Sequence, residues 1–301
     1  MDLVRACPLL HAPFRVSWWC ANAYAQFAVF LAKCALYAHI YASLFEHEVL
    51  VLPDGQAVRL LWLHHAAPRG VVLLLHGILG ASTDFAPLAR VLHTAGFAVV
   101  GFDRRGHGLP LTVPRFNTTG SVADLEVVLQ HVRSRLAAPI YAVGVSAGSS
   151  VLARYLGETR ERSLVAAAVC ISPGFAFERS LSTISGVPEK AVLTRMKAFF
   201  LHAHAAVLRS APQHERMMAA RTVLDWHEHQ YAFAGYTDRA AYFLKEDPVH
   251  VLRDVQVPVL YLNASDVRLW CLAPLCAWSH ACVAGHGLPW AAADFPIRFF
   301  V

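Results

Sequence analysis

The chain has 301 residues, enough for one catalytic domain with a large buried core and too few for two. Hydrophobic residues make up 56% and charged residues 16%, with a mean hydropathy of +0.41, which excludes a disordered chain. The net charge of +5 comes from scattered Lys and Arg residues without a basic stripe, so no nucleic-acid partner is expected. The seven cysteines, none in CxxC spacing, predict free thiols in an intracellular protein.

The first predicted element is an apolar helix within residues 1–46. Residues 17–45 contain one formal charge, Lys33, which forms a narrow polar stripe with Asn22 and Gln26 on a helical wheel. Three interpretations remain open. The helix lies in the membrane interface, spans the bilayer with its stripe against a partner, or packs on the catalytic domain. The first two predict a membrane-associated protein that is anchored through this segment.

Residues 47–301 show strands that alternate with helices. Alternating or continuous apolar runs predict strands at 48–52, 57–63, 71–75, 98–102, 140–143, 164–171 and 257–262. Helical spacing predicts helices at 84–95 and 122–136. The first two strands form an antiparallel hairpin, and the rest predict an α/β fold with a mostly parallel, doubly wound sheet flanked by helices. Residues 174–245 are predicted to form a helical lid between the last two strands.

A nucleophilic serine is predicted where the strand at 140–143 runs into the sequence GVSAG at residues 144–148. Helical spacing resumes at once, and a G-x-S-x-G motif between a buried strand and a helix is a nucleophile elbow. The elbow holds the hydroxyl of Ser146 exposed above the edge of the sheet. We therefore expect Ser146 to attack a carbonyl group, as in acyl transfer through a covalent intermediate.

An oxyanion hole is expected beside this serine. The first helical turn after the elbow contributes the backbone N–H of Ala147. A second N–H is expected from Ile78 or Leu79, in the sequence HGILG that follows the strand at 71–75. Two histidines in neighbouring loops, His76 and His107, are interpreted as structural residues rather than bases.

Several motifs together resemble one branch of a known family. HGILG at 76–80, VPR at 113–115, VGVS at 143–146 and YLGE at 155–158 are similar to the membrane-anchored lipid-esterase branch of the α/β-hydrolases. That branch includes the yeast medium-chain ethyl-ester synthase/esterases and related animal phospholipases, and the resemblance covers about residues 48–266. One departure is Asp103, where the family usually has asparagine.

The resemblance implies hydrolysis of carboxylic esters in acylglycerols, phospholipids or fatty-acid esters, with acyl transfer to an alcohol as an alternative. It implies no metal and no organic cofactor. Acyl chains are expected to bind in the lid against Phe199, Phe200 and Leu201, unless these side chains form the core of the lid itself. No oligomeric state is predicted.

The remaining triad members are expected in the order acid, then histidine. The resemblance implies Asp266 as the acid, after the strand at 257–262. The resemblance also implies a base in a Gly-Gly-His turn further along the chain, and GHG at 285–287 is the nearest match, so His286 is the expected base, with His280 as the alternative. The tail 267–301 is atypical, because it gathers three cysteines and three tryptophans and lacks the closing helix of the family. Altered splicing, a shifted reading frame or a gene-model error would explain such a tail, and a catalytically impaired lipid-binding or interaction protein is then the alternative function.

Overall fold

The computed structural model describes residues 41–263, seven helical positions before them (25, 28, 29, 32, 33, 36 and 40) and the backbone of the strand 297–300. Two members of the predicted triad, Asp266 and His286, lie outside the described residues, as do the alternative base His280 and the tail up to residue 296. Within the described part of the chain, no helix reaches the length and hydropathy that a bilayer crossing requires.

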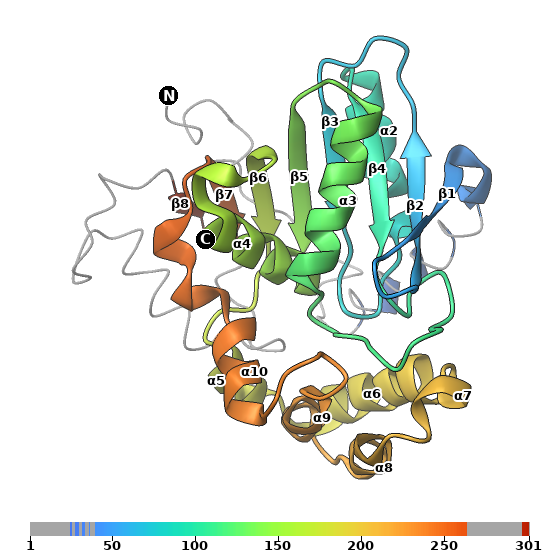
Figure 1. Ribbon diagram of the computed structural model, residues 1–301, viewed down its shortest axis with the longest axis vertical. Coiled ribbons are helices and arrows are strands. Elements are labelled where there is room, and N and C mark those ends of the chain that lie inside the picture. Colours follow the sequence, from blue (N-terminus) through green and yellow to red (C-terminus); the bar gives the residue numbers. More distant parts are fainter. Residues whose placement is uncertain are drawn as a thin grey trace.

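An eight-stranded sheet in the order β1-β2-β4-β3-β5-β6-β7-β8 forms the centre of the fold (Figure 1). The strands are β1 (Glu46–Val51), β2 (Ala57–Leu63), β3 (Val71–Leu75), β4 (Ala98–Asp103), β5 (Ile140–Val145), β6 (Val165–Ile171), β7 (Val259–Leu262) and β8 (Ile297–Phe300). β2 pairs antiparallel with β1 and with β4, and all other neighbours are parallel. This sheet confirms the predicted α/β class.

Helices cover both faces of the sheet. These are α2 (Ala86–Thr94), α3 (Val122–Arg135) and α4 (Ala147–Thr159), with short 3-10 turns η3 (Ala42–Leu44), η4 (Ser82–Phe85), η5 (Arg160–Arg162), η7 (Pro248–His250) and η8 (Leu252–Asp254). Buried residues of α3 and α4 share one core with the sheet, and those of α2 share another on the opposite face with Phe45. All five residues of β3 are buried because both of its faces are covered, which explains the unbroken apolar run VVLLL.

A helical insertion, residues 177–246, lies between β6 and β7. It contains α5 (Phe177–Thr183), α6 (Gly186–Met196), the π-helical turn η6 (Lys197–His202), α7 (Ala205–Leu208), α8 (Pro212–Ala219), α9 (Val223–Gln230) and α10 (Arg239–Glu246). Figure 1 shows these helices gathered at the edge of the sheet where the parallel strands end. The insertion has a hydrophobic core of its own, in which Phe200 and Leu201 are fully buried while Phe199 is half-buried. Burial of Phe200 and Leu201 favours a role as core residues over contact with a ligand.

Element bounds follow the sequence pattern closely. The strands predicted at 57–63 and 71–75 are confirmed residue for residue. The helix predicted from residue 84 begins instead as the 3-10 turn η4. β7 begins at Val259 rather than at 257, because Pro258 has no N–H to give to the ladder; its carbonyl accepts from Ala168 N–H. β8 was not predicted, since four residues are too few to reveal a strand period.

Candidate active site

The candidate site lies where the strand order reverses. From β3 the chain continues to β4 on one side, and β5 pairs with β3 on the other side. In open α/β sheets such a switch point leaves a crevice at the carboxyl ends of the strands. Two loops follow the carboxyl ends of β3 and β5, one beginning at His76 and the other at Ser146. The topology therefore brings the HGILG loop and the serine elbow together.

Ser146 has the backbone geometry of a sharp turn between β5 and α4. Its φ of 54° and ψ of −121° lie in a region that residues with side chains rarely adopt, and its side chain is exposed. The N–H of Ser146 donates to the carbonyl of Ile171 at 2.8 Å, which ties the turn to the end of β6. The turn thus presents the hydroxyl at the sheet edge.

Two glycines make this turn sterically allowed. A side chain at Gly144 would come within 2.6 Å of the carbonyl oxygen of Gly148, and one at Gly148 would overlap the carbonyl oxygen of Leu75. β5, the first turn of α4 and the end of β3 therefore approach one another at backbone contact. Ala147 is the first residue of α4, where backbone N–H groups have no partner within the helix.

The loop after β3 lies directly beside the serine. The position that a Cβ would take at Gly77 is 3.5 Å from the Cβ of Ser146. Ile78 and Leu79 follow, half-buried, and pack against the core of the helical insertion. The structure therefore groups four predicted site residues, Ser146, Ala147, Ile78 and Leu79, at one end of the sheet.

Buried polar side chains from the turn after β4 hydrogen-bond to backbone carbonyl groups of this loop. Arg104 Nη2 donates to the carbonyl of Gly77 at 2.8 Å and to that of His76 at 3.1 Å, while Nη1 donates to Thr118 O at 3.0 Å. The His107 ring contributes Nε2, 2.9 Å from the carbonyl oxygen of Ile78. Burial lowers the pKa of Arg104 to about 10, which leaves it charged at neutral pH.

His76 and His107 both have the character of structural histidines. Their rings lie 4.4 Å apart between centroids, and His76 Nε2 accepts from the N–H of Arg104 at 3.3 Å. Burial, together with the charge of Arg104, lowers the pKa of His76 well below its usual value and that of His107 to about 4. Among residues 41–263, no hydrogen bond joins the Ser146 hydroxyl to a histidine ring. His76 and His107 therefore do not serve as a base for Ser146 in this structure.

The predicted acid and base are not among the groups that the structure brings together. Asp266 and His286 fall outside the described residues. The chain reaches Asn263 directly after β7, which is parallel to β5 and β6 and so ends at the same sheet edge as Ser146. Asp266 and His286 remain predictions.

The sequence pattern does not indicate two ion pairs that join distant segments of the chain. Arg154 of α4 donates to Glu246 of α10 at 2.6 Å, and Tyr236 also donates to that carboxylate, at 2.5 Å. Arg59 of β2 forms two bonds, of 2.8 and 2.6 Å, to the fully buried Asp103. The partners lie 92 and 44 residues apart, so no local pattern reveals them. The partners of Arg104, at residues 76, 77 and 118, are likewise distant in the sequence.

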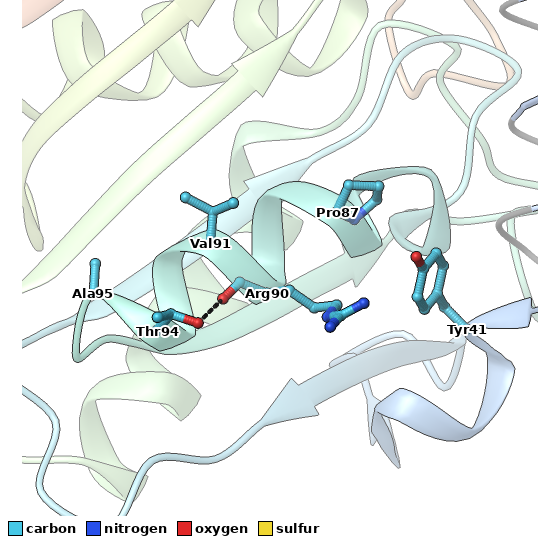
Figure 2. A pocket seen from close by; sticks show the side chains of 6 residues that line it. All are labelled: Tyr41, Pro87, Arg90, Val91, Thr94 and Ala95. Atoms are coloured by element: carbon cyan, nitrogen blue, oxygen red, sulfur yellow. Dashed lines mark hydrogen bonds between the residues drawn. The ribbon is translucent and has the colours of Figure 1, made fainter.

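A surface hollow of about 530 Å³ lies along α2 (Figure 2). The guanidinium of Arg90 lies over the ring of Tyr41 there, 5.8 Å from its centroid. α2 packs on the opposite face of the sheet from α4, so this hollow is not part of the candidate site. It is lined by Tyr41, Pro87, Arg90, Val91, Thr94 and Ala95.

Comparison with known proteins finds a hydrolase family profile, two relatives in sequence and a solved structure of similar fold. A family profile described as serine aminopeptidase S33 matches residues 66–241, more than half of the chain. Protein ABHD15 of Homo sapiens is 30% identical over 73% of this chain and 50% of its own length, and phospholipase ABHD3 of Mus musculus is 28% identical over 74% and 58%. The chain thus spans about half the length of these relatives. The solved structure named AbyA5 shares the fold, with a TM-score of 0.50 and 18% identity over 91% of this chain and 70% of its own.

Proposed function

Because the chain belongs to the α/β-hydrolase family described as serine aminopeptidase S33, we propose that it is a serine esterase that cleaves carboxylic esters of lipids through an acyl-enzyme on Ser146. The observation that carries the proposal is the elbow, in which a strained and exposed serine stands beside the loop after β3. Strain at a single exposed nucleophile is typical of a catalytic turn.

The proposed reaction follows the general serine mechanism. The Ser146 Oγ bonds to the ester carbonyl carbon, and its proton passes to His286, which Asp266 orients. The N–H groups of Ala147, Ile78 and Leu79 bind the negative oxygen of the tetrahedral intermediate. The C–O bond to the alcohol breaks as His286 returns the proton to the leaving oxygen. Water then repeats the sequence and releases the acid.

Lipid esters are favoured over peptides by two observations. Relatives that match most of this chain include a protein named as a phospholipase, although the family description names an aminopeptidase. The loop beside Ser146 also carries apolar side chains: Ile78 and Leu79 pack on the insertion core, as does half-buried Phe199, whose ring lies 5.0 Å from that of His107 between centroids. An apolar surrounding suits a fatty acyl chain better than a charged amino terminus.

Labelling with a fluorophosphonate probe tests the nucleophile. We expect the folded full-length protein to be labelled, Ser146→Ala to lose the label completely, and Ser182→Ala to keep it, because Ser182 is exposed on α5 of the insertion. His286→Ala should reduce ester turnover by at least about a thousandfold. A folded wild-type protein that reacts with neither probe nor ester would reject the esterase in favour of the catalytically impaired alternative.

The substrate class is tested with matched substrates. We expect turnover of 4-nitrophenyl octanoate, monoacylglycerol and phosphatidylcholine to exceed that of alanine 4-nitroanilide. Faster cleavage of the anilide would contradict the lipid-ester assignment while leaving Ser146 as the nucleophile. Adding an alcohol and measuring the new ester distinguishes acyl transfer from hydrolysis, because both pass through the same acyl-enzyme.

A further inference from the structure

Two consecutive carbonyl groups in the loop after β3 are bound by buried side chains from one turn. Arg104 Nη2 lies 2.8 Å from the oxygen of Gly77, and His107 Nε2 lies 2.9 Å from that of Ile78. Arg104 is 3% exposed and His107 is 1% exposed. In both side chains the loop carbonyls therefore take the place of water as hydrogen-bond partners. These hydrogen bonds favour one arrangement of the loop, because a buried donor without an acceptor would destabilise the folded state.

Because a peptide group is planar, binding of these two carbonyls also fixes the direction of the N–H groups of Ile78 and Leu79. In a planar trans peptide the C=O of one residue and the N–H of the next point in opposite directions. The carbonyls of Gly77 and Ile78 point toward Arg104 and His107, so the N–H groups of Ile78 and Leu79 point away from them. Gly77 in the same loop faces Ser146.

We propose that Arg104 and His107 are positioning residues that hold the peptides Gly77–Ile78 and Ile78–Leu79 with their N–H groups toward the oxyanion formed at Ser146. The proposal rests on the esterase function proposed above. A flip of either peptide would replace a donor by a carbonyl oxygen, which repels the developing negative charge. Neither side chain touches the substrate; both act through the loop.

The proton on His107 can be assigned from its two neighbours. Nε2 is 2.9 Å from the carbonyl oxygen of Ile78, and Nδ1 is 3.1 Å from that of Arg105. Because burial lowers the pKa of His107 to about 4, the ring carries one proton at neutral pH. We assign this proton to Nε2, where the acceptor is closer and the ring can donate to the loop.

The assignment gives a pair of variants that differ only in where they carry an amide N–H. A glutamine amide nitrogen reaches the position of a histidine Nε2, whereas an asparagine amide nitrogen reaches that of Nδ1. We therefore expect full-length His107→Gln to keep kcat for 4-nitrophenyl octanoate within about threefold of wild type. His107→Asn should lower kcat by about ten- to a hundredfold with KM nearly unchanged, somewhat less than the complete loss of an oxyanion donor.

The control is His227→Asn, another buried histidine, which contacts Tyr242 within the insertion and should keep the wild-type kcat. Equal kcat in the two His107 variants, whether high or low, would overturn the positioning role. If circular dichroism shows that His107→Asn is unfolded, Arg104→Lys serves as the second test. It retains the charge but cannot bind the carbonyls of His76 and Gly77 as arginine does. A kcat within threefold of wild type would then reject the proposal. An inactive wild-type protein would instead reject the esterase function itself.

Discussion

Ser146 adopts a backbone conformation that costs about 1–3 kcal/mol, and its neighbours must hold it there. Its carbonyl accepts from the N–H groups of Ser149 and Ser150, while its own N–H donates to Ile171. Ser149 Oγ lies 2.6 Å from the same carbonyl oxygen. These bonds, together with the close approach allowed by Gly144 and Gly148, fix the turn on three neighbouring elements.

At this scale we predict that Gly148→Ala severely destabilises the protein. The added methyl group would overlap the carbonyl oxygen of Leu75, a backbone atom at the end of β3 that cannot rotate aside. We expect the free energy of unfolding in urea to fall by at least about 3 kcal/mol. Gly174→Ala is the control, because its methyl group would meet only Ser150 Oγ at 3.6 Å. Equal stability of the two variants would contradict this account of the elbow.

Pairs of elements are joined by buried charges rather than by apolar contacts alone. Asp103, at the end of β4, binds Arg59 of β2 and accepts from the N–H of Ser82 in η4 at 2.7 Å. One carboxylate thus connects two strands and a turn near the site. The partner charge of Arg59 explains why an aspartate suits this position.

We predict that Asp103→Asn lowers the free energy of unfolding by about 2–3 kcal/mol. An asparagine keeps the shape and still accepts from Ser82, but it leaves the Arg59 charge without its partner. The effect stays below the range for fully buried pairs, because Arg59 is partly exposed. Urea denaturation is the measurement, and the double variant Arg59→Met/Asp103→Asn should recover part of the loss. A double variant no more stable than the single one would show that the charge is not the cause.

The described part of the molecule combines two hydrophobic cores of the sheet, the separate core of the insertion and helical positions before residue 41 with exposed apolar side chains. Leu36 and Ile40 are helical and 52% and 53% exposed. Lys33 is also helical and exposed. We propose that these side chains contact a lipid surface, with Lys33 at the headgroups.

The prediction at this scale concerns vesicle binding. The full-length double variant Leu36→Ser/Ile40→Ser should sediment with anionic phosphatidylcholine/phosphatidylserine vesicles at least about tenfold less than wild type, because it loses two apolar side chains for burial. Val187→Ser is the control, since Val187 is 76% exposed, more than Leu36 or Ile40, but lies in the insertion. Loss of binding in both variants would mean that exposed apolar residues in general are responsible, and no loss in either would reject the proposed surface.

The sequence by itself determined the α/β class, the strands β2 and β3 to the residue, and the elbow with its strand-turn-helix context. These features are local: a buried strand needs a continuous apolar run, and a strained turn needs glycines at its flanks. The same local pattern indicated that the loop at 76–80 would approach Ser146, because both follow parallel strands of one sheet.

Only the tertiary structure decided how that loop is held. Its carbonyls are bound by Arg104 and His107, which lie 27 and 29 residues further along the chain. Tertiary packing also buries the side chains of Phe200 and Leu201 in the core of the insertion. It brings Arg154 to Glu246, which is 92 residues further along the chain. Contacts between distant segments depend on the strand order and on how the insertion folds over the sheet. No periodicity or motif in the sequence indicates the strand order. The elbow can therefore be predicted from the sequence, whereas the residues that hold the neighbouring loop are seen only in the fold.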